Sequence, residues 1–141
     1  MTHRERILKW VLRGFGCSSL SAAFFVAAPY SWMNAIHQWL GLGVLPDAPV
    51  VGYLARSTSA FYAMLGGLLC VLSFDVRRFR PVLLYLGGAT VVMGLTMFIV
   101  DWVEGLPPFW RYWEGPLDAG LGIAILWLVW WSGEPSEPSS N

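Results

Sequence analysis

Four long stretches without a charged residue constrain this chain more than any other feature of its sequence. No Asp, Glu, Lys or Arg occurs in residues 14–46, 57–74, 81–100 or 119–133, which are 33, 18, 20 and 15 residues long. A helix that rises ~1.5 Å per residue needs roughly 20 mainly apolar residues to cross the ~30 Å hydrocarbon core of a membrane. With their edges adjusted, these stretches predict four membrane-spanning helices at residues 7–28, 50–74, 81–103 and 116–131.

The composition agrees with a lipid environment. Only 13% of the residues are charged and the mean hydropathy is +0.54, whereas soluble domains carry about 25% charged residues. The net charge of zero lacks the basic excess that neutralises phosphates, so we expect no nucleic-acid partner. The predicted fold is all-α, a four-helix transmembrane bundle formed by residues 1–131 and followed by a disordered tail at residues 132–141.

The first predicted span has a competing interpretation as a cleaved secretory signal peptide. Its basic start, with Arg4, Arg6 and Lys9, fits that interpretation. Arg13 interrupts the apolar stretch, however, and Pro29 follows the small residues at the junction, which makes a poor cleavage site. We therefore expect this span to be retained.

The basic residues predict an orientation. Seven of the nine lie at the amino terminus or between the second and third spans, and basic loops stay in the cytoplasm. Both termini are therefore expected to be cytoplasmic, in the cytoplasmic (inner) cell membrane, with the loops at residues 30–49 and 104–115 outside. Most of the tryptophans fall at the predicted membrane edges, where indole rings prefer to lie.

A short amphipathic helix is predicted at residues 31–40 of the first outer loop. Its apolar face carries Trp32, Ile36 and Trp39, and its polar face carries His37. We expect it to lie in the outer membrane interface. A metal or haem at His37 lacks a second ligand, because the other histidine, His3, lies on the opposite side of the membrane. We therefore interpret His37 as a polar interfacial residue and predict no metal site.

Charged residues at the outer ends of the spans form the candidate site. Arg56 lies about two turns inside the second span, where a charge needs a partner or must reach the interface. Asp101 and Glu104 end the third span, where a carboxylate opposes the helix dipole, so a nearby cation is expected to compensate. Pro116 is expected to begin the fourth helix, with Asp118 in its first turn. The predicted polar cluster consists of Arg56, Asp101, Glu104, Arg111, Glu114 and Asp118, with His37 above it.

Two interpretations of this cluster stay open. It is either a salt-bridged clasp between three helices or the polar floor of an outward-facing pocket roofed by the interfacial helix.

No phosphate-binding loop, nucleophile elbow or Cys-x-x-Cys pair occurs, so no catalytic residue or cofactor is evident. Cys17 and Cys70 are interpreted as packing residues. Small residues spaced four apart are expected at the helix contacts, namely Gly14, Ser18 and Ala22, then Ser59, Ala63 and Gly67, then Thr90 with Gly94, and Gly120 with Ala124.

Residues 8–131 resemble the small DoxX-like membrane families. The resemblance is carried by the arginine in Ala55-Arg56-Ser57, the Leu65-Gly66-Gly67-Leu68 run behind it and the Arg80-Pro81 entry to the third span. It implies a four-span bundle, and some members of those families are associated with quinone-linked sulfur oxidation. The first outer loop is longer and richer in Trp than the pattern of those families.

Three functions stay open. The first is a non-enzymatic accessory protein or complex subunit whose partners are the lipid bilayer, other membrane subunits or further copies of the chain. The second is a quinone-binding subunit of a membrane redox system. The third is a small-molecule carrier, which is disfavoured because the predicted midplanes, around Phe24, Ala63, Val92 and Leu126, contain no ionisable residue.

Overall fold

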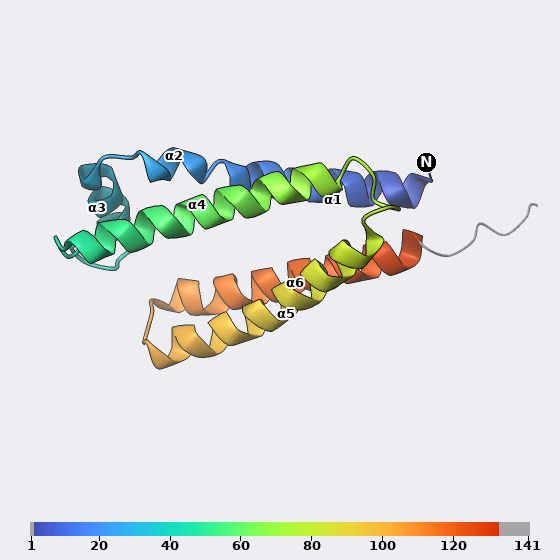
Figure 1. Cartoon of the computed structure of the whole chain (residues 1–141). Coiled ribbons are helices and arrows are strands. Elements are labelled where there is room, and N and C mark those ends of the chain that lie inside the picture. Colours follow the sequence, from blue (N-terminus) through green and yellow to red (C-terminus); the bar gives the residue numbers. More distant parts are fainter. Residues whose placement is uncertain (1, 133–141) are drawn as a thin grey trace, which may run out of the picture.

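The computed structural model describes residues 2–132, and within this range the chain forms helices and no strands (Figure 1). The predicted tail beyond Ser132 lies outside the described residues. The all-α prediction is confirmed for the described part of the chain. Its helices are α1 (His3–Leu20), α2 (Ala23–Val26), α3 (Tyr30–Trp39), α4 (Pro49–Leu72), α5 (Arg80–Val103) and α6 (Pro108–Ser132).

Three of these helices, α4, α5 and α6, are long and apolar enough to cross a membrane. The predicted spans at residues 50–74 and 81–103 correspond closely to α4 and α5. Helix α1 differs from them because its first half carries most of the basic residues of the amino terminus. The structure therefore supports a membrane protein, with α1 outside the set that qualifies by length and composition.

The first predicted span is not one continuous helix. Helix α1 ends at Leu20 and the four-residue α2 follows after a tight turn. The hydroxyl of Ser21 donates to the Ser18 carbonyl at 2.6 Å, and the Ala22 amide bonds the Ser19 carbonyl at 3.1 Å. Serine hydroxyls compete with the helical ladder in this way, and bonds between residues three apart tighten the turn. The prediction of an unbroken helix at residues 7–28 is therefore wrong.

The long helices form two hairpins. Helices α1 and α2 pack against α4, whereas α5 packs against α6, and the hairpins meet through α1 and α6. They converge at the end that holds the amino terminus and diverge toward the other end (Figure 1). The space between the diverging ends matters for the candidate site described below.

An apolar core fills the converging end. Its buried residues come from α1, α4, α5 and α6, so this end holds all four long helices together. It is the main place where the two hairpins touch. The core consists of Leu8, Leu12, Leu69, Leu72, Leu83, Ile125, Leu128 and Val129.

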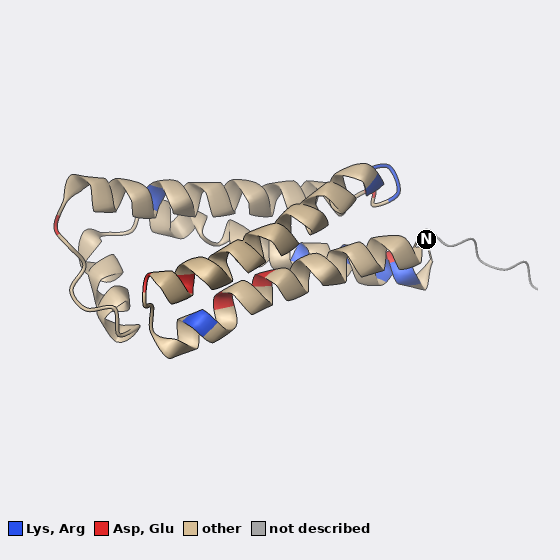
Figure 2. Ribbon diagram, turned by 90° about the horizontal axis from the view of Figure 1, so that it is seen from below, with Lys and Arg blue, Asp and Glu red and all other residues tan. Residues whose placement is uncertain are grey.

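Polar contacts close the same end. Glu5 is only 3% exposed and forms an ion pair with Arg77 of the loop between α4 and α5. The hydrogen bond from Arg77 lowers the pKa of the Glu5 carboxyl. Arg4 donates to the Trp131 carbonyl at 3.0 Å, and Arg13 donates to the Ser73 hydroxyl at 3.2 Å. Most of the basic residues gather here, as Figure 2 shows.

Glycines set the close approach within each hairpin. A Cβ atom on Gly66 of α4 would lie 2.4 Å from the Leu20 amide nitrogen, and one on Gly94 of α5 would lie 2.4 Å from the Ala119 nitrogen. Of the contact positions expected from four-residue spacing, Gly94 is in tight contact. Gly14 and Gly120 have no atom within 4 Å of the corresponding Cβ position, so the expectation is wrong for both.

The substitution Gly94→Ala is expected to lower the free energy of unfolding by about 1–3 kcal/mol, because the added methyl group overpacks the α5–α6 contact. Gly88→Ala on the same helix is the matched control, since nothing lies within 4 Å of its Cβ position. It is expected to leave stability unchanged or to raise it by up to ~1 kcal/mol. Thermal unfolding in a neutral detergent measures both, and equal Tm values would contradict the packing described.

Candidate functional site

Acidic residues gather at the diverging end of the α5–α6 hairpin (Figure 2). Asp101 and Glu104 lie at the end of α5, and Glu114 and Asp118 lie on the facing helix α6 together with Arg111. The tight α5–α6 packing brings these residues together. Most of the predicted polar cluster therefore belongs to one hairpin.

Arg56 is not part of this group. Its Nη2 atom donates to the Ala28 carbonyl at 3.3 Å, just after α2. Among residues 2–132, no ion pair joins Arg56 to Asp101 or Glu104. Carbonyl groups at a helix end lack intrahelical partners, so a nearby guanidinium stabilises one of them. The structure thus gives Arg56 a partner within its own hairpin, in place of the predicted clasp.

Asp101 and Arg111 retain unused hydrogen-bonding capacity. Asp101 is 2% exposed, and its Oδ2 atom has no hydrogen-bond partner within the described chain. The same holds for the buried Nε atom of Arg111. The Arg111 guanidinium instead lies 4.6 Å from the ring centre of Trp102, in a cation–π contact. A buried polar atom without a partner costs ~1–3 kcal/mol, which makes this end of the hairpin receptive to an added polar group.

Glu114 links the acidic residues to α4. The Trp110 indole nitrogen donates to the Glu114 carboxylate one turn away on α6. Glu114 interacts electrostatically with Asp101 and Asp118, and the Tyr62 hydroxyl of α4 interacts with Glu114 and Asp118. We call Asp101, Glu114 and Asp118 the acidic group. The sequence did not indicate that Tyr62 faces it.

Asp118 lies far from any helix end. Helix α6 begins at Pro108, where the Pro107 carbonyl accepts the Trp110 amide at 2.9 Å, and Pro116 lies inside the helix. Asp118 is therefore the eleventh of the 25 residues of α6, near its middle. The expected start at Pro116 is wrong, because α6 begins eight residues earlier and this proline lies inside the helix. The dipole of α6 therefore does not explain the position of this carboxylate. The expectation that the middle of each span contains no ionisable residue does not hold for α6.

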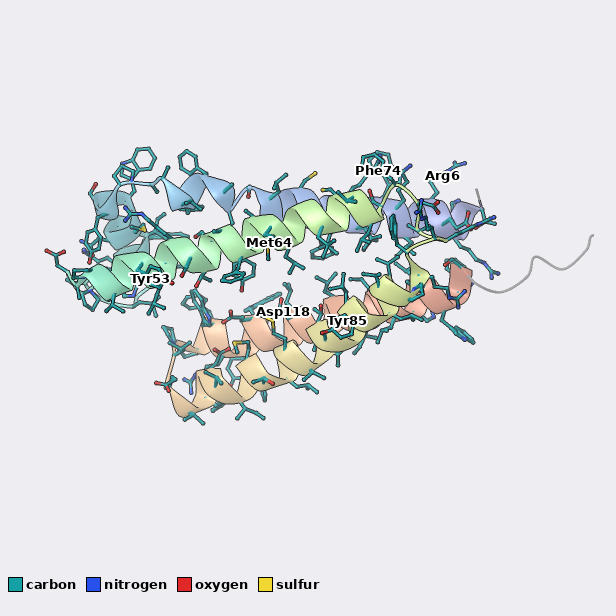
Figure 3. The ribbon with its side chains drawn as sticks, viewed as in Figure 1. Arg6, Tyr53, Met64, Phe74, Tyr85 and Asp118 are labelled. Atoms are coloured by element: carbon teal, nitrogen blue, oxygen red, sulfur yellow. The ribbon has the colours of Figure 1, made fainter. Side chains whose placement is uncertain are left out.

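A cavity of about 370 Å³ lies between the hairpins. We call it the interhairpin cleft. Tyr62 belongs both to its wall and to the surroundings of the acidic group. In Figure 3, Asp118 lies on the side of α6 that faces α4, across from Met64. The walls are apolar apart from two hydroxyl groups, and consist of Thr58, Phe61, Tyr62, Met64, Leu65 and Met93.

A second cavity, of about 230 Å³, lies beneath α3. Helix α3 occupies the predicted position and is tied to the loop that follows it, since the His37 Nδ1 atom lies 2.9 Å from the Gly43 carbonyl oxygen. Asn34 accepts a hydrogen bond from the Leu45 amide at 2.8 Å. His37 lines this cavity, but no residue of the acidic group does. The predicted pocket roofed by the interfacial helix is thus separate from the carboxylates, and Trp110 borders both.

The cysteines lie closer together than their separation in sequence indicated. Gly16 packs against Cys70, and a Cβ on Gly16 would lie 2.7 Å from the Cys70 sulfur. Both thiols are free. In the described part of the chain, no group of three or more His, Cys, Asp or Glu side chains is arranged to hold a metal ion.

Comparison with protein-family models, curated proteins and solved structures finds no match to this chain.

Arg56→Gln and Glu104→Gln are expected to change the free energy of unfolding additively, within about 0.3–0.5 kcal/mol, because their side chains do not interact. Unfolding of both single variants and the double variant in a neutral detergent measures the coupling. The pair Glu5→Gln and Arg77→Gln provides a control in which the ion pair predicts a measurable coupling. A larger coupling between Arg56 and Glu104 would restore the clasp.

Proposed function

We propose that this protein is a four-span, non-enzymatic membrane protein whose interhairpin cleft binds an amphipathic molecule from the bilayer. Helices α4, α5 and α6 are three of the spans, and α1 continued by α2 is the fourth. Helix α3 lies in the outer interface. The observation that carries the proposal is the cleft, an apolar space between two hairpins that meet mainly at one end.

The contacts of two arginines support the fourth span. Arg13 bonds Ser73 at one end of α4, and Arg56 bonds the carbonyl of Ala28 toward the other end. The segment of α4 from residue 56 to residue 73 rises roughly 26 Å, close to the ~30 Å hydrocarbon thickness. Helices α1 and α2 run beside α4 over this distance (Figure 1). Both arginines would then lie near membrane surfaces, where charged side chains are tolerated.

The distribution of charge supports the orientation. The basic residues at the converging end favour the cytoplasm for that end, with both termini there and the diverging end outside. The cleft then opens toward the outer leaflet. We place the protein in the cytoplasmic (inner) cell membrane, and the resemblance to DoxX-like families stays a prediction that no comparison tests.

After Asn141, a fluorescent-protein fusion that works in the cytoplasm is expected to be active and a phosphatase fusion that works outside is expected to be inactive. Inserted after Gly43, the two reporters are expected to give the opposite result. The three spans α4, α5 and α6 between these two sites require opposite results, and a fourth span requires that a reporter at the amino terminus agrees with the one after Asn141. Fusions with a phosphatase and with a fluorescent protein measure them. A cytoplasmic reporter at Gly43, or an external one after Asn141, would overturn the four-span topology.

The dimensions and chemistry of the cleft support an amphipathic ligand. Small-molecule pockets commonly measure ~300–1,000 Å³ and combine apolar walls with a few polar groups. The cleft has about 370 Å³, with Met64, Leu65 and Met93 available to an apolar chain and the Tyr62 hydroxyl to a polar head group. Phe61 and Met64 are about two-thirds exposed, so this face of α4 is open to an occupant.

Met93→Trp is expected to lower the amount of amphipathic molecule that co-purifies with the protein, because the larger side chain fills the cleft. Val92→Trp is the matched control, since Val92 is the adjacent exposed residue of α5 and does not line the cleft. Mass spectrometry of molecules extracted from protein purified in mild detergent measures the amount per chain. Equal amounts in both variants and the parent protein would contradict binding in the cleft.

A further inference from the structure

The acidic group carries more negative charge than its neighbours compensate. With its carboxylates ionised, it holds three negative charges, and Arg111 is the basic residue that shares its hairpin end. Arg56 is directed to Ala28, and the ion pair between Glu5 and Arg77 lies at the converging end. No ion pair among residues 2–132 involves Asp101, Glu114 or Asp118. The cleft therefore borders a site with an excess of negative charge.

The position of these carboxylates makes this excess costly. Tyr62, which faces Glu114 and Asp118, lies six residues beyond Arg56 along α4, or roughly 9 Å deeper in the proposed span. Charges at such depth are costly unless they are paired. The Trp110 indole donates to the Glu114 carboxylate but does not neutralise it, whereas a bound cation or a proton would.

Asp101 provides an independent observation. Its side chain is 98% buried, its Oδ2 atom lacks a donor in the described chain, and it interacts electrostatically with Glu114 inside the hairpin. Buried carboxylate oxygens without donors are rare, because losing water without a replacement partner is unfavourable. An added positive group near Glu114 would stabilise this carboxylate as well.

The aromatic residues of the cleft fit the same ligand. Phe61 and Tyr62 line the cavity, and Trp110 contacts Glu114. Aromatic faces attract ammonium-type cations, and the attraction strengthens when water is excluded. An anionic lipid head group would be repelled by the acidic group, and a neutral quinone would gain nothing from its charge. For a bare metal ion, residues 2–132 offer no group of three or more His, Cys, Asp or Glu side chains arranged to hold it.

We propose that the cleft binds a lipophilic organic cation, with its positive charge beside Glu114 and Asp118 and its apolar part between α4 and α5. This proposal rests on the proposed function, since it names the class of amphipathic molecule that the same cleft takes. Asp118 does not line the cleft itself, but in Figure 3 it lies toward the space between the hairpins, and it interacts electrostatically with Tyr62 of the cleft wall.

Tetraphenylphosphonium and tetraphenylborate provide the test, because they share their shape and differ in the sign of their charge. Equilibrium dialysis against the full chain in dodecyl maltoside measures binding of each. Saturable binding of the phosphonium at one per chain, without saturable binding of the borate, is the expected result. This comparison of the two probes uses the unsubstituted protein, so its outcome does not depend on how any variant folds.

Glu114→Gln and Asp118→Asn are each expected to weaken phosphonium binding about tenfold or more, as the loss of a charged partner in a low-dielectric site predicts. Glu104→Gln is the matched control, because Glu104 is an exposed acid at the end of α5. It should leave binding unchanged. Equal binding of the two probes, or phosphonium binding that neither substitution alters, would overturn the cation proposal.

The two proposals fail in distinguishable ways. If phosphonium does not bind but Met93→Trp still removes a co-purifying molecule, the ligand is not a cation and the cleft remains its site. A stoichiometric quinone in that extract would likewise exclude a cation and would favour a redox role. If Met93→Trp and Val92→Trp behave alike and phosphonium does not bind, both proposals are wrong.

Discussion

Apolar packing between α1, α4, α5 and α6 at one end of the molecule is the interaction on which the rest of the structure depends. Glycine contacts hold each hairpin together along its length, but the two hairpins meet mainly where Leu8, Leu83 and Val129 are buried. The Glu5–Arg77 ion pair fixes the same end. Within residues 2–132, no comparable buried core joins α4 to α5 and α6 farther along, so the opposite ends diverge, and the interhairpin cleft follows from that divergence.

Much of the fold could be predicted because hydropathy and charge are local properties. The end of α4 and the start of α5 match the edges of charge-free stretches closely, since Asp75 and Arg80 interrupt the apolar sequence there. Two features were not predictable in that way. Pro116 has the same local signature inside a membrane helix as at its start. The glycines that touch, such as Gly16 and Gly66, depend on which face of each helix meets its partner, and spacing along one helix does not determine that.

The candidate site was likewise predictable where it depends on consecutive helices and not where it depends on how the two hairpins pack. Asp101, Arg111, Glu114 and Asp118 could be grouped from the sequence because α5 and α6 are consecutive antiparallel helices, so their joined ends must be neighbours. The partner of Arg56 and the role of Tyr62 depend on how one hairpin lies against the other. In the structure, Arg56 donates to the Ala28 carbonyl, and Tyr62 is the α4 residue that interacts electrostatically with Asp118.

Although the net charge is zero, the basic and acidic residues lie toward opposite ends of the molecule. Nine basic and nine acidic residues balance over the chain, yet most bases lie at the converging end and the acidic group lies toward the diverging end. In the proposed orientation, the basic end holds the termini in the cytoplasm, which leaves the carboxylates nearer the outer surface. A cation entering the outer leaflet would meet uncompensated negative charge there and find the bases too distant to oppose it. Under both proposals, the same charge distribution would orient the chain and select the sign of its ligand.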